Sequence, residues 1–105
     1  MSMEKEVLKI STSAPVVVFS KTYCGFCSGV KSLFEQLEVE NIKVLELDTM
    51  PDGPSIQDTL AKLTGQRTVP SVFIGGKFIG GMSETRKFHS KGLLIPALKE
   101  AGAVH

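Results

Sequence analysis

The stretch Val16-Val17-Val18-Phe19-Ser20-Lys21-Thr22-Tyr23-Cys24-Gly25-Phe26-Cys27 decides the fold of this chain. Its first four residues are apolar without interruption, which is typical of a strand covered on both faces. From Gly25 onward the apolar residues recur at helical spacing, which predicts an amphipathic helix over 25–38. The expected inward-facing positions of that helix are Phe26, Val30, Leu33, Phe34 and Leu37. A buried strand therefore runs into a helix through a turn that carries both cysteines of the chain.

The segments on either side of this turn extend the pattern. Residues 42–47 predict a second strand, and a strand, helix and strand at this spacing form a βαβ unit with parallel strands. Before the unit, residues 4–10 predict a short helix. The expected inward-facing residues of this short helix are Val7, Leu8 and Ile10.

After a loop at 50–54, Ser55 is expected to cap a third helix. The inward residues of this helix are expected to be Ile56, Leu60 and Leu63. Gly65 suits a left-handed position at its end.

The last third of the chain predicts a hairpin followed by helices. Gly75-Gly76 separates the apolar segments 72–74 and 77–79, as in a two-residue hairpin. Ser83 is expected to cap a short helix reaching about residue 89, and a final helix over 93–101 holds Pro96 in its first turn. We therefore predict an α/β fold: a four-stranded mixed sheet with helices on both faces, in the order βαβ, helix, ββ hairpin, helix.

Length and charge exclude several classes of protein. A chain of 105 residues is long enough for one domain, 1–105, and too short for two. The net charge of +1 argues against a nucleic-acid partner. The chain has no apolar run near the ~20 residues of a membrane span, and its first ten residues lack a signal-peptide core. With only two cysteines, these features indicate a reducing, cytoplasmic location, although removal of a targeting segment stays open.

The two cysteines have the spacing of a redox pair. Cys24 directly precedes the helix, where unpaired N–H groups and the nearby Lys21 stabilise a thiolate, so Cys24 is the candidate nucleophile. Cys27 lies one turn further on and is the candidate resolving thiol. The alternative, half of a structural zinc site, needs four ligands, and only His89 and His105 remain to supply histidine nitrogens.

Three segments together resemble class I dithiol glutaredoxins: 20–27, with an unusual Cys-Gly-Phe-Cys pair, 68–74 (TVPSVFI) and 80–84 (GGMSE). The similarity spans roughly residues 15–103. Thioredoxins differ, since they usually place Trp before the first cysteine, and this chain has Tyr23 there and no Trp.

The resemblance implies a thioredoxin-like fold and an enzyme activity, the glutathione-dependent reduction of protein–glutathione mixed disulfides and of disulfides. Cys24 would attack as a thiolate and Cys27 would resolve the intermediate. Glutathione would be the reductant, and the partners would be glutathionylated or disulfide-containing proteins. The chain would act as a monomer.

The same resemblance implies a glutathione site. Lys21, Gln57 and Arg67 match positions that hold the glycine carboxylate. Each taken alone would more often be a solvated surface side chain, but the three matches together argue against that interpretation. Val69-Pro70 matches a turn with a cis peptide bond, in which the backbone of Val69 pairs with the cysteinyl part of glutathione. The residues expected to flank this part of the site are Thr68 and, beside the sulfur, Tyr23.

The γ-glutamyl end of glutathione is expected at the start of the fourth helix. Gly81 allows close approach of the backbone, and the N–H groups of Met82 and Ser83 would bind the γ-glutamyl carboxylate. Glu84 replaces the more common Asp of the family and would accept the γ-glutamyl ammonium group.

The residues between the cysteines depart from the family pattern. Many dithiol members have Pro-Tyr there, whereas this chain has Gly25-Phe26. Members without that proline include some that share a cluster between two chains, so a [2Fe–2S] function stays open. In that alternative each chain of a dimer gives Cys24 and two glutathiones give the other thiolates. Apart from this cluster, we expect no metal site.

Overall fold

The structure, a computed structural model, describes residues 2–104 of the chain. Its elements follow one another in the order α1 (Met3–Ser11), β1 (Val16–Ser20), α2 (Gly25–Gln36), β2 (Ile42–Glu46), η1 (Leu47–Thr49, a 3₁₀ turn), α3 (Gly53–Thr64), β3 (Ser71–Ile74), β4 (Lys77–Gly80), α4 (Met82–Ser90) and α5 (Leu94–Ala101). Every helix and strand predicted from the sequence is present.

The four strands form one mixed sheet in the order β2-β1-β3-β4. β1 and β2 are parallel, with Val16 opposite Ile42 and Ser20 opposite Glu46, whereas β3 runs antiparallel to both β1 and β4. The hairpin between β3 and β4 turns at Gly75 and Gly76, whose positive φ angles of 59° and 79° suit a two-residue turn. The predicted βαβ unit and hairpin are therefore confirmed.

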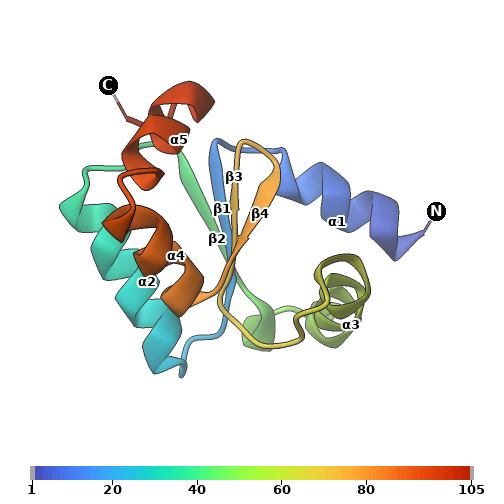
Figure 1. Cartoon of the computed structure of the whole chain (residues 1–105). Helices are drawn as coiled ribbons and strands as arrows, with labels where there is room; N and C mark the ends of the chain where they lie inside the picture. Colours follow the sequence, from blue (N-terminus) through green and yellow to red (C-terminus); the bar gives the residue numbers. More distant parts are fainter. Residues whose placement is uncertain (1, 105) are drawn as a thin grey trace.

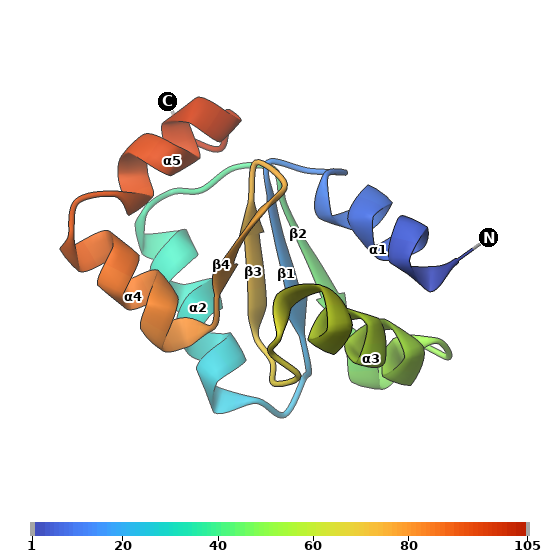
Figure 2. The ribbon, with the colours of Figure 1, turned by 45° about the vertical axis from the view of Figure 1, so that its right-hand side comes forward.

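Helices cover both faces of the sheet, so the molecule has three layers. Figure 1 shows α1 and α3 on one side and α2, α4 and α5 on the other, and the turned view of Figure 2 keeps this division. On the α2 side the buried residues are Val16, Val18, Val30, Phe34, Val72, Ile74, Leu94, Leu98 and Ala103. On the α3 side they are Val7, Val17, Phe19, Leu45, Leu47, Ile56, Leu60 and Phe73. Alternate residues of β1 serve opposite cores, which explains its unbroken apolar run.

Three apolar residues that were expected to face inward are exposed. Phe26 is 70% exposed, because it lies in the first turn of α2 and the inward position there belongs to Cys27. Leu8 is 52% exposed, since one helical step separates it from the buried Val7. Leu63 is 40% exposed in the last turn of α3, beyond the part of that helix that packs on the core.

Both serine caps were predicted wrongly. α3 begins at Gly53 and not after Ser55, with Asp52 at its cap and Pro54 in its first turn. Only glycine fits at position 53, because an added Cβ would lie 1.9 Å from the carbonyl oxygen of Leu47. α4 begins directly after Gly81, whose N–H group donates to the Glu84 carboxylate at 2.7 Å. The side chain of Glu84, the third residue of the helix, thus satisfies the N–H group at the cap in place of the expected serine.

Two details at helix ends were predicted correctly. Gly65 ends α3 with a φ of 76°, and Pro96 lies in the first turn of α5. Among residues 2–104, no helix combines the length and apolar character that crossing a membrane would require.

Candidate active site at the start of α2

Cys24 is the residue at the N-terminal cap of α2. Its backbone is extended, with φ −91° and ψ 117°, and its sulfur accepts a hydrogen bond from the N–H group of Cys27 at 3.3 Å. The thiol also donates to the carbonyl oxygen of Val69 at 3.7 Å. The first turn of the helix therefore directs an N–H group at this sulfur, which is the arrangement that stabilises a thiolate.

Cys27 lies one turn into α2 and is completely buried. Burial raises the pKa of the Cys27 thiol above its usual value, and a hydrogen bond with the Cys24 side chain raises it further. Both cysteines are free thiols, and Cys24 is only half-buried. The structure thus presents one accessible and one inaccessible thiol on the same helical turn.

The loop between β1 and α2 is anchored to η1. The Asp48 carboxylate accepts hydrogen bonds from the backbone N–H group of Thr22, at 3.0 Å, and from the Thr22 hydroxyl. These bonds hold the pKa of Asp48 below its ordinary value. Asp48 had no predicted role, although the register that pairs Ser20 with Glu46 places Thr22 opposite Asp48 two residues further along.

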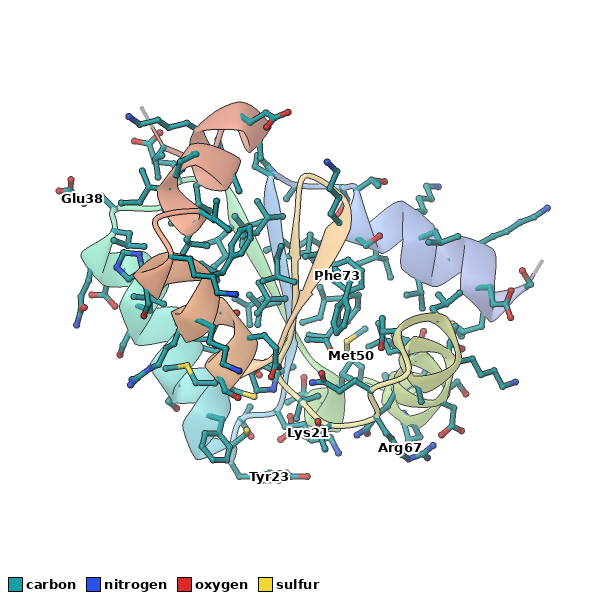
Figure 3. The ribbon with its side chains drawn as sticks, in the orientation of Figure 1. Lys21, Tyr23, Glu38, Met50, Arg67 and Phe73 are labelled. Carbon is teal, nitrogen blue, oxygen red and sulfur yellow. The ribbon has the colours of Figure 1, made fainter. Side chains whose placement is uncertain are left out.

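Tyr23, next to the nucleophile, is 74% exposed. The Lys21 ammonium lies 5.9 Å from the centroid of its ring, within the range of a cation–π contact. In Figure 3, Lys21, Tyr23 and Arg67 all lie at the same end of the molecule.

A groove of about 420 Å³ lies between the start of α2 and the start of α4. It is lined by Gly25, Phe26, Gly29, Val69, Pro70, Met82, Ser83 and Arg86. The peptide bond between Val69 and Pro70 is cis, as the resemblance implied. Four predicted site residues therefore share one groove. Arg86, which belongs to none of the sequence motifs, joins them four residues after Met82 on the same helix.

A smaller cavity of about 250 Å³ contains two of the predicted carboxylate-binding residues, Lys21 and Gln57, together with Asp48. The Gln57 side chain donates to the carbonyl oxygen of Arg67 at 2.9 Å, which ties α3 to the following loop. The Arg67 guanidinium forms an ion pair with Asp58. Arg67 is exposed and lines neither hollow.

The start of α4 offers backbone donors. Met82 and Ser83 are its first two residues, so their N–H groups have no acceptor within the helix. Glu84 accepts hydrogen bonds from the N–H group of Gly81, at 2.7 Å, and from the Ser83 hydroxyl, at 3.3 Å. The bond from Gly81 holds the pKa of Glu84 below its usual value, so Glu84 is a carboxylate at neutral pH. Its contact with a ligand ammonium group stays a prediction, as does a flanking role for the exposed Thr68.

No metal centre forms within a single chain over the described residues. Among residues 2–104, no three His, Cys, Asp or Glu side chains gather as metal ligands. His89 is half-buried in α4, and His105, the other histidine weighed as a zinc ligand, lies outside the described residues.

Comparisons with known proteins show the family to which the chain belongs. The family model for glutaredoxins matches residues 16–79. A glutaredoxin of Ricinus communis is 58% identical over 104 residues, which cover 99% of this chain and 100% of that protein.

Two solved structures show the same fold at about half identity. The buckwheat glutaredoxin–glutathione complex has 50% identity and a TM-score of 0.94, covering 98% of this chain and 93% of that one. The holo form of glutaredoxin C1 from Populus tremula x tremuloides has 48% identity and a TM-score of 0.90, covering 94% of this chain and 97% of that one. The chain belongs to the glutaredoxin family, whose members are thiol oxidoreductases.

Proposed function

We propose that this protein uses glutathione to reduce protein–glutathione mixed disulfides and disulfides. The observation that carries the proposal is the Cys24 thiol at the cap of α2, half-buried and in contact with the N–H group of Cys27. A relative with half its residues identical and the same fold is known as a complex with glutathione.

The first step is attack by the Cys24 thiolate on the glutathionyl sulfur of a mixed disulfide. A bond forms between Cys24 and glutathione, and the protein substrate leaves as a thiolate that takes up a proton. A second glutathione thiolate can then attack the glutathionyl sulfur on Cys24 and leave as oxidised glutathione. Alternatively, Cys27 attacks the Cys24 sulfur, which releases glutathione and forms the Cys24–Cys27 disulfide.

Glutathione would extend from the smaller cavity, past Cys24, into the groove at the start of α4. Lys21 and Gln57 would hold its glycine carboxylate, with Arg67 joining once it leaves Asp58. The backbone of Val69 would pair with the cysteinyl residue, and the N–H groups of Met82 and Ser83 would bind the γ-glutamyl carboxylate. Its sulfur would then face Cys24, which already contacts the carbonyl oxygen of Val69.

Separate replacement of the cysteines tests the proposal. We expect Cys24→Ser to abolish the reduction of a glutathionylated peptide, because no other exposed thiol can attack. Cys27→Ser should keep this activity, since glutathione itself resolves the intermediate, and should lose the reduction of disulfides that require two thiols. Equal loss of deglutathionylation in both variants would contradict the assignment.

A second candidate function is the sharing of a [2Fe–2S] cluster between two chains. Tyr23 and Phe26, which flank Cys24 closely in sequence, are 74% and 70% exposed, and a second copy could cover these two rings. Each chain has only one accessible thiol, so the cluster would need Cys24 of both chains and the thiolates of two glutathiones. Such a dimer would be inactive as a reductase, since its nucleophile would be occupied, and would act as a cluster carrier or sensor.

Anaerobic reconstitution with iron, sulfide and glutathione tests this candidate. A coloured dimer that survives Cys27→Ser and is lost with Cys24→Ser would support it. A colourless monomer would leave the reductase as the remaining function.

We also propose a cytoplasmic location, because the catalytic cycle needs a pool of reduced glutathione. Imaging of the tagged chain would test this.

A further inference from the structure

A small polar cluster lies behind Cys27, on the face of the sheet covered by α2. Ser20 and Glu46 are partners in the parallel register of β1 and β2. The Lys31 ammonium of α2 forms an ion pair with Oε2 of Glu46 at 2.6 Å. The other oxygen, Oε1, is buried and has no hydrogen-bond partner among the described residues. The proposed reaction does not use this ion pair.

The cluster adjoins the resolving cysteine. Cys27 and Lys31 are four residues apart on α2, so they lie on the same side of the helix, and the ion pair shows that this side faces β2. Ser20, at the end of β1 and opposite Glu46 in the register, is completely buried, as Cys27 is, and its hydroxyl donates to the carbonyl oxygen of Lys21 at 3.4 Å.

Ser20 also influences the pKa values of both Cys27 and Glu46. Burial raises the pKa of the Cys27 thiol, and the Ser20 hydroxyl acts in the opposite direction. Burial alone would raise the pKa of Glu46 too, but the paired Lys31 ammonium, with a smaller influence from the Ser20 hydroxyl, holds it below its usual value. Glu46 is therefore a carboxylate at neutral pH, and its charge balances that of Lys31.

Charge balance next to a buried thiol controls its reactivity, because only the thiolate attacks a disulfide. An uncompensated ammonium beside Cys27 would favour the thiolate, whereas an uncompensated carboxylate would oppose it. The other ionisable groups near this turn are Cys24 on α2, Lys21 after β1 and Asp48 on η1, and Asp48 is already bonded to Thr22.

We propose that the Lys31–Glu46 pair decides how the glutathionylated intermediate is resolved, with Glu46 restraining Cys27 so that a second glutathione can compete. This inference rests on the proposed function. Glu46 and Lys31 act through Cys27 and touch no substrate, so they are positioning residues. When Cys27 does resolve, its thiol first loses its proton to water; its sulfur then bonds to Cys24, the bond from Cys24 to glutathione breaks, and glutathione leaves as a thiolate that takes up a proton.

The test measures the products of one oxidation event. The reduced protein is mixed with limiting oxidised glutathione and quenched with acid, and mass spectrometry gives the ratio of the Cys24–Cys27 disulfide to glutathionylated Cys24. We expect Glu46→Gln to raise this ratio severalfold, because Lys31 becomes uncompensated. Lys31→Gln should lower it, and the double variant should return close to the starting protein.

Matched controls come from the helix on the opposite face of the sheet. Glu6→Gln and Lys9→Gln on α1 make the same charge changes far from Cys27, at exposed positions, and should leave the ratio unchanged. The opposite signs expected for Glu46→Gln and Lys31→Gln distinguish an electrostatic effect from simple loosening of the structure, which would move both variants in one direction.

Two results would overturn the inference. A lower ratio with Glu46→Gln would mean that Glu46 helps to remove the proton of Cys27, and unchanged ratios in both single variants would mean that the pair has no influence. If Glu46→Gln does not fold, Lys31→Gln carries its own prediction. The failure of Cys24 to become glutathionylated in the starting protein would be recognised separately, since it overturns the proposed function itself.

Discussion

The first turn of α2 has an exposed side and a buried side, and the two are built differently. On the exposed side, Cys24 is surrounded by groups in contact with solvent, among them Tyr23 and the Thr22–Asp48 pair. On the buried side, Cys27 is completely enclosed, and Lys31, four residues further along the same side of α2, is paired with Glu46. Water can replace most contacts of the exposed side, but few of those on the buried side. The same chemical group, a thiol, is therefore accessible to solvent at Cys24 and enclosed by the protein three residues later, at Cys27.

The largest difference is expected in the chemical reactivity of the two thiols. Iodoacetamide should modify Cys24 almost exclusively near neutral pH, because Cys24 is accessible and bonded to a helix N–H group, whereas burial raises the pKa of Cys27. The measurement is the alkylation rate against pH, with the site assigned by mass spectrometry. Preferential modification of Cys27 would contradict the assignment of Cys24 as the reactive thiol and Cys27 as the protected one.

Substitutions at two adjacent residues, one buried and one exposed, should change the free energy of unfolding by different amounts. Cys27→Leu adds volume to a fully buried site and should lower the free energy of unfolding by about 1–3 kcal/mol. Phe26→Leu, at a position 70% exposed, should change it by no more than about 0.5 kcal/mol. Urea denaturation measures both. Equal losses would show that Phe26 is packed in solution, contrary to the structure.

The binding side chains of the exposed side should contribute modestly one by one. Lys21→Ala, Gln57→Ala and Arg67→Ala should each raise the KM for glutathione by roughly tenfold or less, if each contact contributes about 1 kcal/mol. The Arg67 effect should be the weakest, since this side chain must first leave Asp58. Steady-state kinetics check these values, with Glu6→Gln as an unaffected control. An unchanged KM in all three variants would show that glutathione binds elsewhere.

The anchor of the exposed loop should have a smaller effect again. Asp48→Ala removes two hydrogen bonds to Thr22, but water can replace both, so kcat/KM should fall roughly two- to threefold. The slow alkylation of Cys27 should be the same in this variant and in the starting protein, which the alkylation rate can verify. A loss beyond tenfold would mean that Asp48 contacts the substrate directly.

The smallest expected effect is the loss, at low pH, of the stability that Asp48 contributes. Because the folded-state pKa of Asp48 is lowered, its bonds to Thr22 contribute stability above the unfolded-state pKa of about 3.9, and this contribution disappears as the pH falls through the folded-state value. The difference in Tm between the starting protein and Asp48→Asn should therefore be constant from pH 7 to about pH 5 and shrink below about pH 4. A difference that grows on acidification would contradict the assigned direction.

The sequence predicted the elements well because their signals are local. The run at 16–19, the glycine pair of the hairpin and the helical spacing after Gly25 each depend on neighbouring residues only. The errors arose where tertiary packing decides. Phe26 fits the apolar stripe of α2 by its spacing, but this first turn of the helix extends past the core, so the Phe26 side chain is exposed. Ser55 is a good capping residue, but the helix already begins at Gly53, a position where only glycine fits against the carbonyl group of Leu47.

The site was predicted less evenly than the fold. Cys24 and Val69 were found because their motifs are contiguous, and the structure brings the two together. Asp48 and Glu46 were missed, since each meets its partner only through the register of β1 and β2 or across the face of α2. Carboxylates that act through distant partners have no spacing signal in a single sequence.

The exposure of Tyr23 has a practical consequence for measurement. The chain contains one tyrosine and no tryptophan, so apart from weak phenylalanine emission its intrinsic fluorescence comes from a single ring. That ring is next to the nucleophilic cysteine, is 74% exposed, and lies 5.9 Å from the Lys21 ammonium. The unlabelled protein therefore carries its own optical reporter at the active site, and titrations or stopped-flow mixing can follow events beside Cys24 without an added dye.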